Sequence, residues 1–504
     1  MAERIHHLLD RWLAEAPARP FIHLPDGRSL SFADLGALTD KAEAELRALD
    51  VRPGDRVLVV AENCPEHAAL ILACSRVGAW SCGVNARMAP AEIDAFVDKA
   101  DARVVFFTAA ASRSAAAHAQ RFAAVDSALP GMQHGAVLHD AQPEAGALRD
   151  TVASLIFTSG TTGQPKGVML THDALIHFAR VSGASRALGP QDRSYAFVPM
   201  THIFGLGTVL MASLHAGAGL VMRSRFDPAD VFDALAHHGV TQLQGPPTLF
   251  NRLLAWLDQQ GVARPDAPAL RYLYTGAAPM TMPLKRAVEQ RFGLPLHHGY
   301  GLSEYAGALC LGRLGEWRDD TAAGYLVDGA ELLVAGPAGQ ALPRGETGEI
   351  WMRGTGLMPG YFRDPEATAQ VMRAGGWYAS GDLGRQDEDG ALFVVGRLKE
   401  MIIRSGFNVY PVEVESVLCG YPGVARAAVA GRATPDGNEE IIAFVEPAGG
   451  ADIDTAGLLA HAAAQLSPYK RPSRLVLVHD MPMTLSGKVL KRDLLAAWAA
   501  ATPD

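Results

Sequence analysis

Residues 154–181 read SLIFTSGTTGQPKGVMLTHDALIHFARV: a short apolar run, a loop rich in glycine and hydroxyl side chains, and a helical pattern. This order is typical of a strand, a loop and a helix in an α/β protein. Glycines let the backbone approach a ligand closely, while backbone amides, hydroxyls and the ammonium group of Lys166 can surround anionic oxygens. The segment therefore predicts a cradle for polyphosphate oxygens at residues 158–167.

The composition of this loop also fits two other kinds of loop, a Walker A loop and a flexible surface loop. It does not follow the Walker A pattern G-x-x-x-x-G-K-S/T, because Pro165 stands five residues after Gly160 and Gly167 follows Lys166. A flexible surface loop without a ligand has a similar composition. The succession of strand, lysine and helix favours the phosphate cradle.

The alternation of apolar runs and helical patterns extends along most of the chain. Runs such as RVLVV at 56–60, RVVFF at 103–107 and GLVM at 219–222 predict a largely parallel sheet covered by helices, hence an α/β fold. Between residues 331 and 396 the runs lie closer together and glycines separate them, which indicates an antiparallel or barrel-like subdomain. After Gly396 the pattern restarts with strands and helices of its own, which predicts a smaller second α+β domain.

Composition supports a multidomain globular protein. The 504 residues exceed what one hydrophobic core usually supports, and they are 49% hydrophobic and 20% charged with a net charge of −9. These values exclude wholesale disorder and disfavour a broad nucleic-acid-binding surface. The five cysteines form no C-x-x-C pair, so neither a disulfide framework nor a structural zinc site is indicated, and we expect a cytoplasmic protein.

The stretch Ser194–Met222 holds no charged residue, and its last 18 residues, Gly205–Met222, reach the lower end of membrane-span length. Its glycines and Pro199 favour a short buried helix that turns into a buried strand. The N-terminus has charges at short intervals and therefore lacks the apolar core of a signal peptide. We expect no integral membrane segment.

Six further motifs follow the loop at 158–167. They are PMTHIFG at 199–205, TGAAP at 275–279, YGLSE at 300–304, SGD at 380–382, GRLKE at 396–400 and PMTLSGK at 482–488. In content and order they resemble the signatures of the acyl-adenylate-forming superfamily, which includes acyl-CoA synthetases, adenylation domains of peptide synthetases and luciferases. The segment PARPFIHLPDGRSLSFADL at 17–35 extends the resemblance almost to the N-terminus.

The resemblance implies a site for ATP and AMP. Tyr300 would offer a flat face to adenine, Ser303 a hydroxyl to the α-phosphate, and Glu304 an oxygen ligand to Mg²⁺. Asp382 would accept hydrogen bonds from the ribose hydroxyls, with Arg397 as their second partner. The superfamily more often has threonine where Ser303 stands, which keeps the hydroxyl. The implied ATP and AMP ligands are Thr158, Ser159, Gly160, Thr161, Thr162, Gly163, Lys166, Gly276, Ala277, Ala278, Gly299, Tyr300, Gly301, Ser303, Asp382 and Arg397.

The resemblance also implies catalysis by Lys166 and Lys488, and a moving C-terminal domain. Lys488 would bridge the incoming carboxylate and the α-phosphate during adenylation. The small domain would then rotate about Lys399 and bring a loop with Ser405 and Gly406 to the site, where CoA enters. We expect an N-terminal domain over 1–396, a hinge over 397–400 and a mobile C-terminal domain over 401–504.

In related proteins the acyl pocket is lined by the segment after His202, by 275–279 and by residues around Tyr300. A dicarboxylate would require a buried cation there, and an amino acid would require a buried acid for its ammonium group; the sequence shows neither. The pocket is therefore expected to take an apolar monocarboxylic acid, aromatic or fatty. His202 either gates the pocket or is a buried core histidine. The expected pocket residues are His202, Ile203, Phe204, Gly205, Gly207, Gly299 and Ala306.

The expected function is that of a freestanding acyl-CoA ligase resembling fatty-acyl-, 4-coumarate- and benzoate-CoA ligases. It would convert a carboxylate and ATP into acyl-AMP and pyrophosphate, and then transfer the acyl group to CoA with release of AMP, using Mg²⁺. Two alternatives remain: an acyl-AMP ligase that loads a carrier protein, and a non-catalytic acyl-nucleotide binder. No peptide-synthetase carrier domain is expected, since the chain stops at Asp504.

Overall fold

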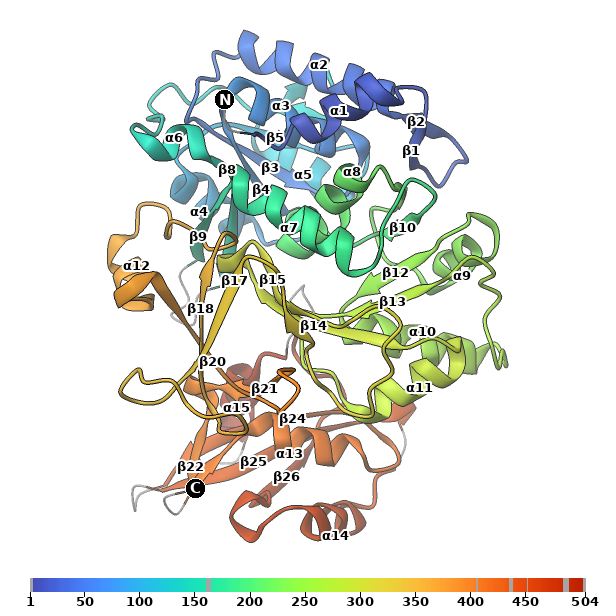
Figure 1. Cartoon of the computed structure of the whole chain (residues 1–504), viewed down its shortest axis with the longest axis vertical. Helices are drawn as coiled ribbons and strands as arrows, with labels where there is room; N and C mark the ends of the chain where they lie inside the picture. Colours follow the sequence, from blue (N-terminus) through green and yellow to red (C-terminus); the bar gives the residue numbers. More distant parts are fainter. Residues whose placement is uncertain are drawn as a thin grey trace.

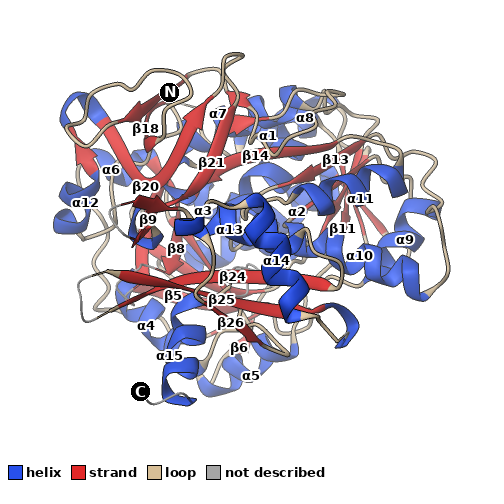
Figure 2. Cartoon of the chain, turned by 90° about the horizontal axis from the view of Figure 1, so that it is seen from below, coloured by secondary structure: helices blue, strands red, loops and turns tan. Residues whose placement is uncertain are grey.

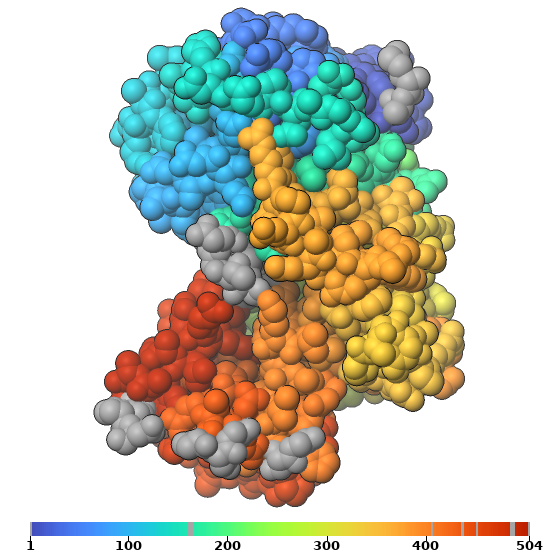
Figure 3. All heavy atoms as spheres, turned by 90° about the vertical axis from the view of Figure 1, so that its left-hand side faces the viewer, coloured from blue at the N-terminus to red at the C-terminus, as the bar shows by residue number. Residues whose placement is uncertain are grey.

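The computed structural model describes residues 3–159, 165–404, 407–434, 438–450, 452–483 and 489–501. Three large sheets build the N-terminal part of the molecule, and a small three-stranded sheet with its own helices forms the C-terminal part at the bottom of Figure 1. The space-filling view in Figure 3 shows an indentation between the blue upper region and the red C-terminal region.

The first sheet has seven strands in the order β6-β7-β5-β3-β4-β8-β9. Its central strands β5, β3, β4 and β8 run parallel, and every residue of β3 is buried because helices cover both faces. Val57 and Val59 pack with α2 and α3, whereas Leu58 and Val60 pack with α4 and α5. The bounds are β3 Arg56–Ala61, β4 Trp80–Asn85, β5 Ala102–Phe107, β6 Val125–Asp126, β7 Gln133–His134, β8 Val152–Ser159, β9 Pro165–Thr171, α2 Phe32–Ala48, α3 Pro65–Val77, α4 Pro90–Ala100 and α5 Arg113–Arg121.

The second sheet has nine strands in the order β16-β15-β14-β13-β12-β10-β11-β1-β2, and its six strands from β14 to β1 run parallel. Leu243 and Leu273 point to the outer face, under α9, α10 and α11. Tyr272 and Tyr274 point to the inner face, toward α7 and the π-helix η1. The bounds are β1 Pro20–His23, β2 Ser29–Ser31, β10 Arg193–Ala196, β11 Gly219–Met222, β12 Gln242–Gly245, β13 Tyr272–Thr275, β14 Leu296–Leu302, β15 Gly307–Leu311, β16 Tyr325–Leu326, α7 His172–Ser185, η1 Phe204–Met211, α8 Ala212–Ala216, α9 Pro228–His237, α10 Pro247–Gln259 and α11 Met282–Phe292.

The third sheet is antiparallel, with the order β17-β18-β20-β19 and β21 paired to β20. It corresponds to the predicted subdomain of closely spaced strands. Its strands are β17 Ala330–Ala335, β18 Gly348–Gly354, β19 Met372–Arg373, β20 Trp377–Gln386 and β21 Leu392–Arg397. The remaining short elements of this part are α1 His7–Glu15, α6 Ala147–Thr151, η2 Ser303–Tyr305, α12 Pro365–Val371, η3 Ala374–Gly376 and η4 Leu398–Glu400.

The C-terminal part combines a hairpin, β22–β23, with a sheet in the order β24-β25-β26. The hydrophobic residues of α13 and α14 pack on one face of this sheet, and Leu494 of α15 packs on the other (Figure 2). The bounds are β22 Ile402–Arg404, β23 Phe407–Val409, α13 Pro411–Cys419, β24 Val424–Ala433, β25 Glu439–Pro447, η5 Ala448–Gly450, α14 Thr455–Gln465, η6 Pro468–Lys470, β26 Arg474–Leu477 and α15 Lys491–Ala501.

The fold confirms the α/β class, the antiparallel subdomain and the smaller second domain. The uncharged stretch 194–222 forms the end of β10, then η1, α8 and β11, so it is a buried helix followed by a buried strand as predicted. Within the described part of the chain, no helix is long and apolar enough to cross a bilayer. One expectation was incomplete: the loop at 158–167 does not lead directly to a helix, because β8 first pairs with antiparallel β9.

The outer face of the second sheet allows a direct test of core packing. Leu243 is fully buried in a cluster with residues of α9, α10 and α11, whereas Leu138 lies on the surface with 41% of its area exposed. Leu243→Ala removes buried methyl groups and leaves a cavity, which costs about 2–5 kcal/mol. We expect a lower midpoint of thermal unfolding for Leu243→Ala and a nearly unchanged one for Leu138→Ala, measured by calorimetry. Equal midpoints would contradict the packing described.

Candidate active site

The predicted phosphate loop lies between β8 and the edge strand β9 of the first sheet. Thr158 and Lys166 are register partners across these antiparallel strands. Ser159 ends β8. The predicted ligands Gly160, Thr161, Thr162 and Gly163 lie outside the described residues, and their role in phosphate binding stays a prediction.

Lys166 lies beside two residues from distant parts of the chain. Its Nζ is 4.7 Å from the centre of the Tyr361 ring, and the Tyr361 hydroxyl donates to Glu304 Oε1 at 3.0 Å. Backbone hydrogen bonds support this arrangement: the Phe362 amide donates to the Gly167 carbonyl at 2.7 Å, and the Met358 amide donates to the Glu304 carbonyl at 2.9 Å. The fold therefore places a cation over the ring of one tyrosine and a carboxylate at its hydroxyl.

Three residues from two sheets form the second cluster of the site. The Tyr300 hydroxyl, at the end of β14, donates to Asp382 Oδ2 of β20 at 2.7 Å. Arg397 Nε, at the end of β21, lies 3.0 Å from Asp382 Oδ1. Burial and the charge of Asp382 raise the pKa of Tyr300 well above its ordinary value, so the phenol remains a donor at neutral pH. Each carboxylate oxygen keeps a second lone pair for a further hydroxyl donor.

Local hydrogen bonds fix the position of Asp382. Its amide donates to the Ser380 hydroxyl at 3.0 Å, and that hydroxyl donates to the Ile350 carbonyl at 2.7 Å. Gly381 has φ of +72°, a conformation that favours glycine, and its amide donates to Glu349 Oε1 at 2.9 Å. The motif SGD is therefore a constrained turn that holds one carboxylate in place.

Segments 276–278 and 299–303 bring the backbone close to this cluster. A Cβ atom at Gly299 would lie 2.4 Å from the Tyr274 hydroxyl, and one at Gly301 would lie 2.1 Å from the Gly307 carbonyl. Ala277 has φ of +67°, and Ala278 follows it in the same turn. Ser303 is buried at the start of η2. Gly276 and Gly299 therefore both lie against the Tyr274 hydroxyl, one residue before Tyr300 in the case of Gly299.

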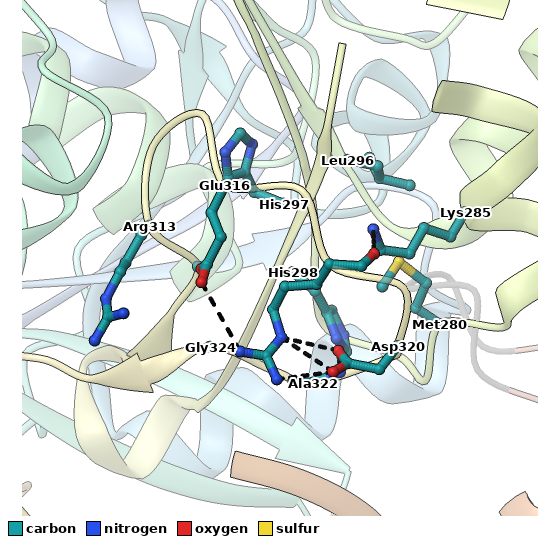
Figure 4. A pocket seen from close by; sticks show the side chains of 12 residues that line it. Met280, Lys285, Leu296, His297, His298, Arg313, Glu316, Asp320, Ala322 and Gly324 are labelled. Atoms are coloured by element: carbon teal, nitrogen blue, oxygen red, sulfur yellow. Dashed lines mark hydrogen bonds and ion pairs between the residues drawn. The ribbon is translucent and has the colours of Figure 1, made fainter. Parts of the chain in front are cut away.

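Several charged residues line a pocket beside β14 (Figure 4). Arg318 forms ion pairs with Asp320 at 2.7 Å and Asp389 at 2.8 Å, and Lys285 Nζ donates to the Arg318 carbonyl at 2.6 Å. His298 Nδ1 is 3.3 Å from the Thr321 carbonyl. These interactions tie the loop after β15 to the strand that carries Tyr300.

The predicted acyl segment lies on the inner face of the second sheet. His202 accepts a hydrogen bond at Nδ1 from the Phe204 amide at 3.1 Å, and Phe204 begins η1 and stands edge-on to Tyr274 with ring centres 5.8 Å apart. The space next to Gly205 is occupied by Pro199, and that next to Gly207 by Phe178. The segment belongs to a buried cluster in which four aromatic residues pack with four aliphatic ones: Phe178, Phe204, Tyr272, Tyr274, Val181, Val198, Ala308 and Leu311. Ile203 and Ala306 belong to the neighbouring core cluster.

One buried cation contacts the predicted acyl segment. Arg186, which follows α7, is 1% exposed and donates to Gln244 of β12 and to the Thr208 carbonyl of η1. The stretch 194–222 is itself uncharged, and the fold brings this charge to it from a neighbouring element.

The C-terminal part contributes fewer described site residues. Lys399 lies in η4, and the hairpin strands β22 and β23 flank the predicted CoA-binding residues. Ser405, Gly406 and Lys488 all lie outside the described residues, so their roles stay predictions.

Sequence reasoning missed Tyr361, Tyr378 and Tyr274. The Tyr361 hydroxyl lies 3.4 Å from that of Tyr378, and burial together with the charge of Glu304 raises the pKa of both phenols. Tyr274 is two residues before the glycine of TGAAP and on the inner face of β13. Alternation along β13 could have indicated Tyr274, but no local signal links Tyr361 to Glu304.

Comparisons with known proteins agree with this arrangement. A family model described as AMP-binding enzyme matches residues 9–362, and one described as AMP-binding enzyme C-terminal domain matches 413–488. The chain is 36% identical to feruloyl-CoA synthase of an Amycolatopsis species over 93% of this chain and 94% of that protein. It is 33% identical to 4-coumarate–CoA ligase 2 of Solanum tuberosum, over 97% of this chain and 92% of that one.

Among solved structures, ATP-bound MatB from Rhodopseudomonas palustris superposes with a TM-score of 0.86 at 30% identity, covering 98% of this chain and 99% of that chain. The family model spans most of the sequence, and CoA ligases align along nearly all of it. The chain therefore belongs to the AMP-binding enzyme family and is an ATP-dependent, AMP-forming acyl-CoA ligase.

Proposed function

We propose that the acid activated by this ligase is aromatic. The observation that carries the proposal is the cluster of Phe178, Phe204, Tyr272 and Tyr274 on the inner face of the second sheet, next to Gly299 and Tyr300. Aromatic rings pack favourably edge-to-face and offset, so this surface suits a flat ring better than a flexible chain. Feruloyl-CoA synthase and 4-coumarate–CoA ligases among the relatives support the same choice.

The reaction has two steps that use the same site. In the first, a carboxylate oxygen of the acid attacks the α-phosphorus of ATP, and the bond from that phosphorus to pyrophosphate breaks. In the second, the CoA thiolate attacks the acyl carbon, and AMP leaves with the electron pair of the acyl–oxygen bond. Both steps require the nucleotide to be held in one orientation.

The described residues suit this task. Asp382 would accept the ribose hydroxyls while Tyr300 and Arg397 fix its two oxygens. Ser303 would donate to the α-phosphate from its place after β14, and Lys166 would neutralise charge on the phosphates leaving as pyrophosphate. Lys488 would add positive charge on the side of the incoming carboxylate.

Glu304 fits the role of a magnesium ligand. Its carboxylate is half-buried and oriented by the Tyr361 hydroxyl, and a carboxylate oxygen is the kind of donor that Mg²⁺ prefers. When bound, the ion would neutralise charge on the ATP phosphates. The Lys166 ammonium, which lies over the Tyr361 ring, would neutralise charge on the same phosphate oxygens.

Domain rotation about Lys399 would separate the two steps. Lys399 lies in η4, between β21 of the third sheet and the hairpin β22–β23. Rotation there would withdraw Lys488 and bring the hairpin toward the acyl-adenylate, which is hinge motion at a few residues. The proposed units are 1–396, 397–400 and 401–504.

A panel assay tests the proposed function. Pyrophosphate release from ATP is measured with cinnamic, benzoic and hydroxylated aromatic acids and with short, medium and long fatty acids, each with and without CoA. We expect CoA-stimulated turnover to be fastest with aromatic acids. A preference for fatty acids would refute the aromatic proposal, and turnover that CoA does not stimulate would favour a carrier protein as acceptor.

Measuring the two half-reactions separately tests whether Lys488 acts in adenylation alone. Lys488→Ala should lower the rate of acyl-AMP formation by about 100-fold or more, since it removes a cation from the developing charge. The reaction of preformed acyl-AMP with CoA should change only a few-fold, as followed by AMP release. Lys41→Ala, an exposed lysine of α2, serves as the control. An equal loss in both reactions would show that the assigned role is wrong.

The Tyr300–Asp382 contact predicts an effect on ATP affinity. Tyr300→Phe removes a hydrogen bond to a charged group, worth about 1.5–3 kcal/mol, so KM for ATP should rise by about 10- to 100-fold. KM for the acid should change little. Tyr195→Phe is a matched control, because the Tyr195 hydroxyl also donates to a carboxylate, that of Asp230, at 2.5 Å. The same KM for ATP in Tyr300→Phe and wild type would contradict the assignment.

Magnesium dependence checks the role of Glu304. Excess EDTA should stop pyrophosphate release, and added Mg²⁺ should restore it. Glu304→Gln should raise the Mg²⁺ concentration for half-maximal rate by about tenfold, the effect of losing roughly 1.4 kcal/mol of binding. Glu331→Gln, in an exposed ion pair with Arg353, should leave that concentration unchanged. An unshifted magnesium curve for Glu304→Gln would exclude it as a ligand.

A further inference from the structure

Two arginines and a tryptophan hold the ring of Phe362. The ring is 1% exposed, and its centre lies 5.3 Å from the Arg56 guanidinium carbon and 4.9 Å from that of Arg363. Trp80 of β4 stands edge-on to the same ring, with ring centres 5.8 Å apart. Cations over an aromatic face and edge-to-face rings both attract, so these three side chains confine the phenyl group of Phe362.

Both guanidinium groups bind one carboxylate. Asp101 Oδ2 lies 2.9 Å from Arg56 Nη2 and 2.8 Å from Arg363 Nη1. The two arginines also donate to the Gln142 carbonyl, at 2.8 and 3.1 Å, and Arg363 Nε pairs with Glu144 at 2.9 Å. Arg56 is fully buried, so water screens its ion pair only weakly. Arg56, Asp101 and Arg363 form what is named here the Asp101 network.

The network holds an unusual backbone turn. Arg363 has φ of +48°, a left-handed conformation that non-glycine residues rarely adopt and that persists where surrounding interactions hold it. The hydrogen bonds of its side chain to Asp101, Gln142 and Glu144 supply that hold. The turn at Arg363 comes directly after Phe362, so the network fixes both the ring of Phe362 and the direction of the chain.

Tyr361 and Phe362 are adjacent but belong to different cores. Phe362 packs in the core of the first sheet, whereas Tyr361 packs in the cluster that contains residues of the second and third sheets. This segment pairs with β9 through a bridge between Tyr361 and Val168 and through the Phe362 amide, which donates to the Gly167 carbonyl. Successive side chains of an extended segment point to opposite sides. A shift of Phe362 would therefore also move Tyr361.

We propose that the Asp101 network is a positioning device for adenylation. Through Phe362 it fixes the Tyr361 ring, whose centre lies 4.7 Å from Lys166 Nζ. The Tyr361 hydroxyl donates to Glu304 at 3.0 Å, so the same ring sets the place of a cation and of a carboxylate. This inference rests on the proposed function, in which Lys166 binds phosphate oxygens and Glu304 binds Mg²⁺. The network touches neither ligand and acts through the two aromatic rings.

Two substitutions in the network test the proposal. Arg363→Met removes the charge from a side chain that is 43% exposed and keeps an apolar stem near Phe362. Asp101→Asn removes the shared carboxylate, and asparagine tolerates the φ of +47° at this position. Pyrophosphate release is measured against Mg²⁺, ATP and the acid that the enzyme uses fastest.

Both variants should shift the magnesium dependence. We expect the Mg²⁺ concentration for half-maximal rate to rise by about three- to tenfold and the saturated rate of acyl-AMP formation to fall, because Glu304 and Lys166 lose their fixed positions. KM for the acid should change little. Unshifted magnesium curves in both variants would overturn the proposal.

Arg271→Met is a matched control for lost stability. Arg271 pairs with Asp192 at 2.7 Å, donates to the Arg186 carbonyl at 2.9 Å and is 34% exposed, so its contacts resemble those of Arg363. It lies before β13, at the end of the strand opposite Gly276. Arg271→Met should lower the midpoint of thermal unfolding and leave the magnesium curve unchanged. An equal shift of that curve in Arg271→Met would show that lost stability, and not positioning, causes the effect.

A double-mutant cycle shows whether the effect passes through Glu304. Because the network acts on Mg²⁺ through this carboxylate, Glu304→Gln combined with Arg363→Met should require the same Mg²⁺ concentration as Glu304→Gln alone. Additive shifts would mean that Arg363 acts independently of Glu304 and would overturn the proposed route.

The failure of the proposed function has a different signature. If Glu304 is not a magnesium ligand, Glu304→Gln itself leaves the magnesium curve unshifted. The network is then tested on Lys166 through KM for ATP. Arg363→Met should raise this KM in the wild-type background and not in Lys166→Ala. An additive rise, or no rise in either background, would overturn the positioning role.

Discussion

The hydrogen bond from Tyr300 to Asp382 joins the end of a parallel sheet to an antiparallel one. Tyr300 lies where β14 leaves its parallel neighbours, and Asp382 lies in a turn that Gly381 and Ser380 constrain. Ligands of α/β proteins commonly bind beyond the carboxyl ends of parallel strands. The antiparallel subdomain supplies a carboxylate at this edge, so the proposed nucleotide site depends on the two sheets meeting there.

A second junction brings the first sheet to the same region. Strand β9 carries Lys166, and the segment around Tyr361 pairs with β9 through the Phe362 amide and an isolated bridge at Val168. Tyr361 then reaches Glu304, two residues after β14. All three large sheets therefore contribute residues to the proposed site, and a change in the packing between any two of them should alter the positions of these residues relative to one another.

The sequence predicted the local structure of short segments better than it predicted contacts between segments that are distant in the chain. The strands β3, β5 and β11 and the π-helical segment as a buried helix followed from local patterns. The resemblance to the superfamily, and not a local pattern, linked Asp382 with Arg397, which the structure places in contact. The hairpin β8–β9 was missed because a glycine-rich loop is compatible with either a helix or a returning strand. The contact between Tyr361 and Glu304 depends on tertiary packing, which the periodicity of either segment does not specify.

Arg186 shows the limit of a charge count along one segment. The stretch 194–222 is uncharged, and this correctly indicated that it is buried. The charges packed against a buried segment, however, come from all the elements that surround it, and here the residue after α7 places a guanidinium against the Thr208 carbonyl of η1 and against Gln244 of β12. Removing a cation from water costs free energy that hydrogen bonds must offset. Tertiary packing can therefore add a large electrostatic term to a segment whose own sequence contains no signal of it.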